Sequence, residues 1–566
     1  MKLPATQHAI QLVGPGELRL VDTKEVPAPG PRQVLARVEA VGLCFSDLKL
    51  LKQFSQHARK GEILEGLPRE VLDEIPSYVP GNRPTVPGHE VVCRIVAVGD
   101  RVRHHSLGER CLVQTDYRTL RTANSNAAFG YNFEGGLQEY VLMDERVIID
   151  PLSGERFLIP VSEDLSASAV ALVEPWACVE DSYANPERRG IKPGGRLLVV
   201  FDKADGIDGL KAAVEADRPG LAVVVPASAA DLSALHRLGI RTDSAHDTSS
   251  LPAESFDDII YFGAEARVIE TLNDKLAPRG IANIVTGGRR IGEPVSVGIG
   301  RVHYGMTRWT GTTGKYAIEA YRSIPRSGEI RPGERIAIVG AGGPMGQMHV
   351  IRNICQGIPD VSIAGTDVDD SRLHALALKA APLARSNRVQ VELINTTRQG
   401  LSGRFSYYAL LAPIGKLVAD AIANSREGCL INVFAGIPAP TRETLDLDTY
   451  IANRCFMFGT SGSVIRDMKV VLEKVERGQL DTNSSVDAVS GMAGAREGLA
   501  AVEDRRLAGK IIVYPTLREL GLTPLAELAR QFPTVGEKLE AGQWTRAAEQ
   551  ELLRVAGTGT ADSPAI

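Results

Sequence analysis

The sequence predicts an α/β protein in which a β-rich first domain precedes two tandem domains built on parallel sheets. The first 150 residues are rich in Val, Gly and Pro and contain short alternating runs at 34–41 and 90–98, which are typical of strands separated by turns. From about residue 165, short apolar strands alternate with helical segments, a pattern that indicates βαβ units. This second pattern occurs twice, and a repeat of this length indicates a whole domain.

The repeat consists of four segment pairs in the same order. They are IKPGGRLLVV at 191–200 with IRPGERIAIV at 330–339, FDDIIYF at 256–262 with FSYYALL at 405–411, LAPRGIANIVTGG at 276–288 with NSREGCLINVFAG at 424–436, and TGTTGKYAIEAYRSIPRSGEI at 310–330 with FGTSGSVIRDMKVVLEKVERGQL at 458–480. The offset is 139 residues at the first pair and 148 or 149 at the later pairs. The shared order favours duplication over a chance similarity between two α/β units.

These patterns predict the domain limits. The β-rich domain covers 1–185 and is completed by 485–515, the first repeat copy covers 186–325, and the second copy covers 326–484. A tail at 516–566 has helical spacing of Leu, Ala and Phe, and its last residues, GTGTADSPAI, are expected to be disordered.

Composition narrows the partners and the compartment. The formal net charge is −5, which predicts no attraction to nucleic acid or to an anionic membrane, and no apolar run approaches the ~20 residues of a membrane span. The N-terminus has no apolar signal core, so we expect a cytoplasmic protein. Seven scattered cysteines favour reduced thiols or a metal ligand over a disulfide framework.

The second copy carries a glycine-rich loop, GAGGPMG, between a strand at 336–339 and a helix expected from Gln347. Glycines let backbone N–H groups approach a pyrophosphate, and the helix N-terminus adds partial positive charge. The next strand, 361–365, leads to Asp367, which can accept a hydrogen bond from a ribose 2′-OH and so favours NAD; Arg372 leaves NADP open. The alternative for Asp367 or Asp370 is a helix N-cap. The predicted cofactor-binding residues of this Rossmann-type domain are Gly340, Gly342, Gly343, Pro344, Met345, Gly346, Asp367, Arg372 and Phe434.

The first copy lacks these features. Asp202, Lys203, Ala204 and Asp205 follow its strand at 197–201, and Gly206 comes late. Because carboxylates repel a pyrophosphate, we hypothesise that this copy has kept the fold and lost the nucleotide.

Three distant motifs carry metal-ligand chemistry. They are VGLCFSDL at 41–48, VPGHEVV at 86–92 and VEPWACV at 173–179, which contain the candidate ligands Cys44, His89, Glu90 and Glu174. Together they match a catalytic zinc, which takes about three protein ligands and leaves one position open. Ser46 could take the substrate's hydroxyl proton, and Asp47 could orient a ligand. Taken singly, each has another interpretation: a core cysteine, a structural histidine, or a glutamate at a helix start. His104 and His105 are expected to be surface loop residues.

These motifs, together with VAVGDRV, GGLQEYV and GAGGPMG in the same order, resemble the zinc-dependent medium-chain dehydrogenase/reductase family. The likeness is to its polyol branch, that of sorbitol dehydrogenase and L-sorbose-1-phosphate reductase. It implies a GroES-like β-rich catalytic domain that carries zinc and a Rossmann domain that carries NAD(P). Carried over, Cys44, His89 and Glu90 are zinc ligands, Glu174 lies at the metal, and Ser46 relays the proton.

The sequence departs from the family in four places. No cysteine follows Cys111 up to 136, so we expect one catalytic zinc and no structural zinc. Lys49 stands where many members have a relay histidine, and with Ser46 and Glu174 it is one of the predicted catalytic residues. The segment 52–82 is either a lid or a surface excursion. The Rossmann domain is doubled, which makes the first copy a spacer or an oligomer surface.

The sequence therefore predicts a zinc- and NAD-dependent oxidoreductase acting on a secondary alcohol or ketone of a polyol, sugar or sugar phosphate, with a homo-oligomer left open. One alternative is a sugar epimerase or lyase that recycles bound NAD. Another is a non-enzymatic scaffold, against which the set of metal ligands argues.

Overall fold

The computed structural model describes residues 3–202 and 207–557. It divides into two compact units, one made of Met1–Glu180 with Ser463–Ile566 and the other of Asp181–Gly462. Lys203, Ala204, Asp205 and Gly206 of the first copy's loop, and residues 558–566 of the expected disordered end, lie outside the described residues.

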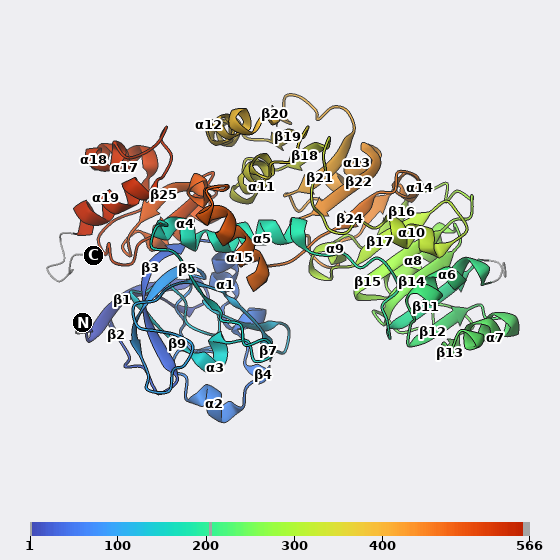
Figure 1. Ribbon diagram of the computed structural model, residues 1–566, viewed down its shortest axis with the longest axis horizontal. Helices are drawn as coiled ribbons and strands as arrows, with labels where there is room; N and C mark the ends of the chain where they lie inside the picture. Colours follow the sequence, from blue (N-terminus) through green and yellow to red (C-terminus); the bar gives the residue numbers. More distant parts are fainter. Residues whose placement is uncertain (1–2, 203–206, 558–566) are drawn as a thin grey trace. The chain divides into compact units, whose positions relative to one another are not determined.

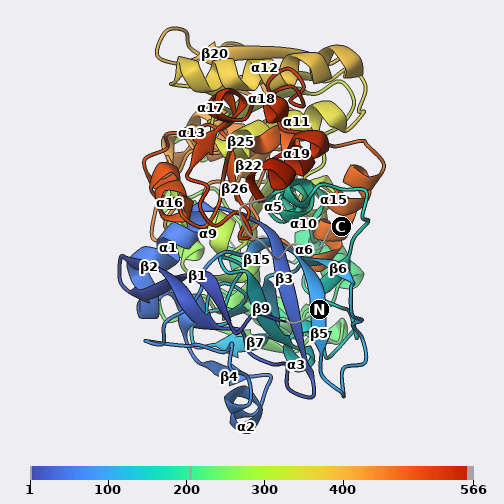
Figure 2. The same cartoon turned by 90° about the vertical axis from the view of Figure 1, so that its left-hand side faces the viewer.

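The first unit is built on an eight-stranded sheet whose central strand is β3. In order along the sheet, its strands are β10 (Leu158–Pro160), β6 (Arg110–Val113), β5 (Glu90–Val98), β3 (Gln33–Gly42), β26 (Lys510–Val513), β25 (Val486–Ser490) and β27 (Thr523–Pro524), with β9 (Tyr140–Asp144) also paired to β3. Figure 2 shows β3, β5 and β9 together, beside the hairpin of β1 (Thr6–Gly14) and β2 (Glu17–Glu25). Strand β26 thus returns the distant C-terminal segment to the centre of the sheet.

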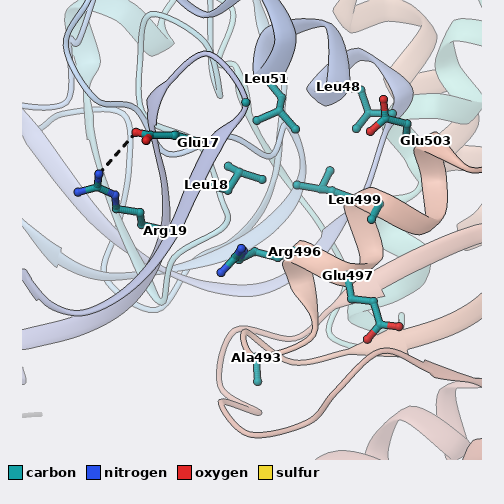
Figure 3. A pocket seen from close by; sticks show the side chains of 12 residues that line it. Glu17, Leu18, Arg19, Leu48, Leu51, Ala493, Arg496, Glu497, Leu499 and Glu503 are labelled. Atoms are coloured by element: carbon teal, nitrogen blue, oxygen red, sulfur yellow. Dashed lines mark hydrogen bonds and ion pairs between the residues drawn. The ribbon is translucent and has the colours of Figure 1, made fainter.

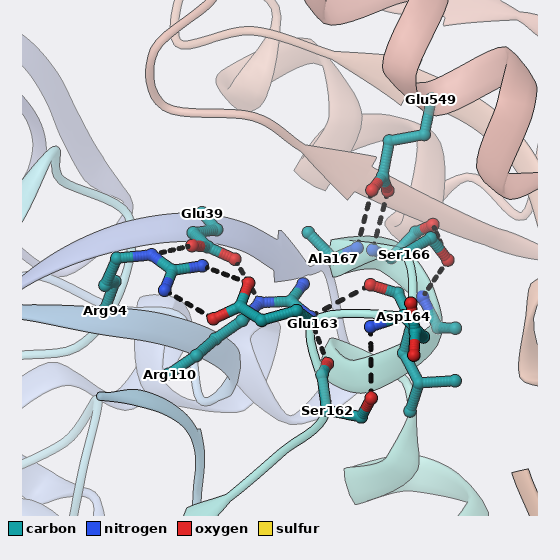
Figure 4. Close-up of polar contacts among 12 residues, drawn as sticks. Glu39, Arg94, Arg110, Ser162, Glu163, Asp164, Ser166, Ala167 and Glu549 are labelled. Atoms are coloured by element: carbon teal, nitrogen blue, oxygen red, sulfur yellow. Dashed lines mark hydrogen bonds and ion pairs between the residues drawn. The ribbon is translucent and has the colours of Figure 1, made fainter. Parts of the chain in front are cut away.

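The helices of the first unit come from both of its chain segments. They are α1 (Phe45–Gln53), α2 (Arg69–Asp73), α3 (Glu145–Ile148), α4 (Ala167–Ala171), α5 (Val173–Ala184, which continues into the second unit), α16 (Ala495–Glu503), α17 (Leu525–Gln531), α18 (Pro533–Gly536) and α19 (Arg546–Gly557). Glu549 of α19 accepts hydrogen bonds from the backbone N–H groups of Ala167 at 2.5 Å and Ser168 at 2.8 Å (Figure 4). Arg94 and Arg110 of adjacent strands share the carboxylate of Glu39, at 3.0 and 2.6 Å. The first set of contacts holds α19 against α4, and the second links strands β3, β5 and β6 of the sheet.

The segment 52–82 folds against the first unit as a short excursion. Its strand β4 (Ile63–Glu65) pairs with β7 (Asp116–Thr122), which also pairs with β8 (Asn126–Ala128). Residues 54–60 form two turns of 3₁₀-helix before β4. The excursion therefore lies against the region in which the sequence predicts no structural zinc.

The second unit contains one twelve-stranded sheet formed by both repeat copies (Figure 1). Its order is β13 (Thr242–Ser244), β12 (Leu221–Val225), β11 (Arg196–Phe201), β14 (Phe256–Phe262), β15 (Leu276–Val285), β17 (Arg308–Thr312), β24 (Phe456–Phe458), β22 (Ser425–Val433), β21 (Phe405–Leu410), β18 (Arg335–Val339), β19 (Ser362–Asp367) and β20 (Gln390–Asn395). Each half therefore has the 3-2-1-4-5-6 order of a dinucleotide-binding domain. The predicted fold class is confirmed.

Helices alternate with these strands in each copy. The first copy has α6 (Asp208–Ala216), α7 (Ala229–Arg237), α8 (Ala266–Asn273), α9 (Gly300–Tyr304) and α10 (Ala317–Ser323); the second has α11 (Pro344–Cys355), α12 (Asp370–Asn387), α13 (Lys416–Ala423) and α14 (Leu447–Ala452), and α15 (Ile465–Glu476) follows in the first unit. Helix α11 begins at Pro344, three residues before the predicted Gln347, because proline is well suited to the first helical position.

Two further expectations meet the structure here. Within the described residues, no helix is both long enough and apolar enough to cross a membrane. The expectation that His105 is a surface residue is wrong. Its side chain is buried, and Nδ1 lies 2.9 Å from Oε1 of Glu145, which also accepts the backbone N–H of His104. Glu145 thus folds this loop inward.

Candidate metal and coenzyme sites

Strand pairing brings two of the predicted ligand motifs together. In the antiparallel pair of β3 and β5, Gly42 lies opposite Glu90. Cys44 follows the end of β3 as the N-cap of α1, and His89 immediately precedes β5. Residues that are 45 positions apart in the chain, Cys44 and His89, therefore meet at one end of this strand pair.

Three of the four predicted ligands form one cluster. The ligand atoms of Cys44, His89 and Glu90 all lie within 4.8 Å of one another. His89 and Glu90 are buried and Cys44 is half-buried. Glu174, in the first turn of α5, lies outside this set, although its charge interacts with those of His89 and Glu90. We call Cys44, His89 and Glu90 the metal cluster.

Asp47 fixes the orientation of His89. Its Oδ1 lies 3.0 Å from His89 Nδ1, while its Oδ2 accepts the Cys44 backbone N–H at 3.0 Å. The carboxylate thus orients the imidazole with Nδ1 toward Asp47 and Nε2 toward Ser46. Burial disfavours the imidazolium, but Asp47 outweighs it and raises the pKa of His89 well above its usual value. Ser46 Oγ lies 3.0 Å from Nε2 and 3.1 Å from Cys44 Sγ.

Glu90 provides the observation that tests whether a cation fits. Its Oε1 accepts a hydrogen bond from Lys510 Nζ at 2.5 Å, but its Oε2 is buried and has no hydrogen-bond partner among the described residues. A Cβ on Gly42 would come within 2.0 Å of that oxygen, so only glycine leaves room for the carboxylate. An unpartnered buried carboxylate oxygen beside a thiol and an imidazole matches the ligand set of a divalent cation.

Lys510 was not singled out from the sequence. Its ammonium group is buried between Glu90 and the carbonyl oxygen of Leu43, which it contacts at 2.7 Å. Burial opposes its charge, but Glu90 outweighs burial and raises the pKa of Lys510 above its usual value. The signal was present in the segment GKIIVYP at 509–515, which carries β26 back to the centre of the sheet.

Glu174 lies in surroundings that favour its protonated form. Burial, followed by the nearby charge of Glu90, raises the pKa of Glu174 to about 7, against opposing effects from His89 and Lys510. A carboxyl group with that pKa can hold or release a proton near neutral pH.

The excursion at 52–82 supplies a further group of polar side chains. The His57 and His89 rings lie on the Tyr131 ring, with centroids 5.0 and 5.7 Å away, and the Arg59 guanidinium carbon is 5.5 Å from that ring's centroid. Arg59 Nη1 is paired with Asp116 Oδ1 at 3.0 Å. Burial, together with the charges of Arg59 and then Lys49, lowers the pKa of His57 to about 4. These residues connect the excursion to the metal cluster through Tyr131.

Other candidate positions fall outside this group. Lys49, predicted as a catalytic residue, is exposed on α1. A hollow of about 710 Å³ lies between the β1–β2 hairpin, α1 and α16 (Figure 3). Its lining includes Leu18, Leu48 and Arg496 and none of the four predicted ligands. This hollow is therefore distinct from the metal cluster.

The glycine-rich loop of the second copy connects β18 to α11. Gly340 has φ +89°, a Cβ on Gly346 would come within 2.2 Å of the Gly340 carbonyl oxygen, and open space surrounds Gly343, the N-cap of α11. Glycine is thus required for the turn and for close packing of helix against strand. Phe434, after β22, packs edge-on against His349, with ring centroids 4.6 Å apart.

Asp367 stands at the end of β19, against this loop. Its Oδ2 accepts the Gly342 backbone N–H at 2.9 Å, and its Oδ1 accepts the N–H of Val368 at 2.8 Å. The N-cap of α12 is Asp369, so Asp367 is not a helix cap. Asp367 therefore lies directly against the glycine-rich loop.

In the first copy, a carboxylate follows β11, the strand equivalent to the one that leads into the glycine-rich loop. Asp202, which directly follows β11, accepts hydrogen bonds from the Tyr261 hydroxyl and from the Ala264 backbone N–H, the latter at 3.0 Å. Arg289 Nη1 lies 3.1 Å from the same carboxylate. The donors at this strand end are therefore already engaged by an anion of the chain itself.

Comparison with known proteins shows which families the chain is similar to. Residues 30–152 match the family described as "Alcohol dehydrogenase GroES-like domain". L-sorbose 1-phosphate reductase of Klebsiella pneumoniae is 28% identical over 338 residues, 55% of this chain and 76% of its own. D-altritol 5-dehydrogenase of Agrobacterium fabrum (strain C58 / ATCC 33970) is 28% identical over 49% of this chain and 75% of its own. Bovine sorbitol dehydrogenase is 34% identical over 101 residues, 18% of this chain and 22% of its own.

A solved structure of a cobalt- and zinc-bound alcohol dehydrogenase from Pyrobaculum aerophilum aligns with 90% of this chain and 100% of its own, at 15% identity and a TM-score of 0.46. The matched domain and the curated relatives confirm the resemblance that the motifs indicated. Residues 30–152 thus form an alcohol dehydrogenase GroES-like domain, and over about half of its length the chain is similar to polyol dehydrogenases and reductases, which are oxidoreductases.

Proposed function

We propose that the chain is a zinc-dependent dehydrogenase that interconverts a secondary alcohol and a ketone on a polyol, with NAD(H) as the hydride carrier. The observation that carries the proposal is the metal cluster, with the unpartnered Oε2 of Glu90 beside Cys44 and His89. A divalent metal ion at such a site polarises an alcohol or carbonyl oxygen. One catalytic ion per chain is expected.

The residues around the cluster support proton transfer. Ser46 Oγ is within hydrogen-bond distance of His89 Nε2 and Cys44 Sγ, so the hydroxyl lies where it can accept the proton that a substrate alcohol gives up. Glu174, with a pKa near 7, can hold a proton in the same region. NAD is expected at the second copy's loop, where Asp367 accepts from the ribose hydroxyl and disfavours a 2′-phosphate.

The pairing of Arg59 with Asp116 favours an uncharged polyol over a phosphate ester. Asp116 Oδ1 balances the charge of Arg59, whose Nη1 lies 3.0 Å away, whereas Arg118, 3.5 Å from Oδ2, has a side chain that is 42% exposed, so solvent screens its charge. A phosphate dianion needs cationic groups whose charge is not already balanced. A paired guanidinium and carboxylate can instead donate to and accept from the hydroxyl groups of a polyol.

The test is a panel of polyols and their phosphate esters, assayed for NAD and NADP reduction, with zinc content measured on the same protein. We expect about one zinc per chain, reduction of NAD in preference to NADP, and faster turnover of an unphosphorylated polyol. Cys44→Ser should remove both zinc and turnover. Full turnover of metal-free protein would exclude the proposal. Purified protein that absorbs near the NADH band and shows no net turnover of the cofactor would favour the epimerase or lyase alternative.

A further inference from the structure

The two repeat copies join through equivalent residues. Their contact, which we call the seam, consists of two antiparallel strand pairs: β17 with β24, and β16 (Val295–Val297) with β23 (Glu443–Leu445). Trp309 lies opposite Met457, and Ser296 lies opposite Thr444. Both pairs are separated by 148 residues, the offset of the last segment pair in the repeat (310 and 458). Trp309 and Ser296 therefore each face their own counterpart, as residues on a two-fold axis do.

Contact between equivalent elements in antiparallel orientation is the geometry of a two-fold symmetric dimer, in which the same surface is used twice. The sheet agrees with it, because the strand order of one copy is the mirror sequence of the other from the seam outward. Contact between two arbitrary surfaces would bring unlike residues together. The seam thus has the symmetry of a homodimer interface although both sides belong to one chain.

The seam is also packed like a permanent interface. Apolar residues of both copies form one continuous core: Val295, Val297, Ile299, Trp309, Leu445, Leu447, Tyr450, Ile451 and Met457. The Tyr450 hydroxyl donates to the Trp309 carbonyl oxygen at 2.8 Å and accepts the Met457 N–H at 2.8 Å, so it bridges the central strands. Such a continuous apolar core is typical of an obligate interface, which resembles the core of a domain.

Polar contacts close the rim of the seam. Asp448 accepts the backbone N–H groups of Ile291 at 3.0 Å and Gly292 at 2.9 Å. Arg442 donates to Asp274 at 2.8 Å and to the Ser296 carbonyl oxygen at 2.9 Å. These contacts cross between the copies and fix the register of β16 against β23.

We propose that the first copy is a built-in partner subunit. It occupies the edge that the second copy would otherwise offer to a second molecule, so the chain completes this two-fold interface within itself and does not self-associate through β23 and β24. This role distinguishes the first copy from a passive spacer. The inference rests on the seam and is independent of the proposed catalytic activity.

The test uses two cysteine substitutions in the full chain. Ser296 is half-buried and Thr444 is exposed, so Ser296→Cys and Thr444→Cys leave the packed core untouched. The doubly substituted protein S296C/T444C is oxidised gently and then unfolded for thiol counting, with wild-type protein oxidised in parallel. We expect two thiols lost per chain relative to unoxidised protein, and a covalent species with the mass of one chain. T444C alone is the matched control and should give no covalent dimer.

Three results would overturn the proposal. A covalent dimer of T444C would show that two second copies meet across the same axis. A disulfide between two chains of S296C/T444C would show that the seam forms between molecules. Retention of both introduced thiols would show that these equivalent positions do not face each other.

Discussion

Replacing Lys510 with Met tests how the metal cluster is balanced. The ammonium group lies 2.5 Å from Glu90 Oε1, and the two side chains are 6% and 0% exposed. Removing one partner of such a buried pair leaves an uncompensated charge, at a cost of about 3–5 kcal/mol. In chelator-treated protein at pH 7, we therefore expect Lys510→Met to lower the free energy of unfolding by about that amount. Lys510→Arg keeps the charge and should lose less.

Zinc should reduce this loss. If Glu90 is a ligand, a bound cation neutralises the carboxylate that the substitution leaves unpaired. The Met variant should then gain more from zinc than wild-type protein does, for which 100-fold excess over the dissociation constant adds about 2.7 kcal/mol. Urea unfolding followed by fluorescence, with and without zinc, measures both effects. Equal losses in both conditions would refute Glu90 as a ligand, and a Met variant as stable as wild type in chelator would refute the pairing.

Three further predictions concern substrate, coenzyme and pH. Asp116→Asn removes the carboxylate that balances the charge of Arg59. Since a charge-assisted hydrogen bond contributes about 1.5–3 kcal/mol, the ratio of kcat/KM for a polyol phosphate to that for the polyol should rise by about tenfold or more. An unchanged ratio would contradict the preference for an uncharged polyol. Asp367→Asn should lower the preference for NAD over NADP by a similar factor, whereas Asp370→Asn, which alters a carboxylate outside the loop contact, should leave it unchanged. In metal-free protein, the raised pKa of Glu174 contributes stability that is complete below pH 4.5 and is lost as pH rises through about 7. Glu174→Gln should therefore make the free energy of unfolding depend less on pH over this range. Identical pH profiles for the variant and wild type would show that Glu174 is not buried as described.

The parts of the site that the sequence could predict are those written in short motifs. Cys44 lies three residues before Asp47, and His89 is next to Glu90, so each candidate ligand can be recognised together with its polar neighbour before the fold is known. The same holds for the loop from Gly340, where spacing alone requires glycine. Strand register then brings Gly42 opposite Glu90.

The contacts that the sequence could not predict are set by tertiary structure. Lys510 is 420 residues from Glu90, and neither position alone indicates the other. Arg59 lies over the Tyr131 ring because the excursion folds back on β7, where Arg59 also pairs with Asp116. His105 illustrates the reverse error, because a histidine in a polar loop becomes buried when one carboxylate collects the loop's donors.

Two parts of the first copy support its role as a partner subunit: the carboxyl end of β11, which a carboxylate fills, and the seam, which stays apolar. At the strand end that corresponds to the glycine-rich loop, Asp202 engages the Tyr261 hydroxyl and the Ala264 N–H, so a nucleotide phosphate would meet a carboxylate there. At the seam, Trp309 remains buried in the core it shares with Met457. A spacer would need neither side kept apolar, and a second coenzyme site would need the loop. Retaining the seam while filling the loop end is the combination that a subunit kept for its contacts requires.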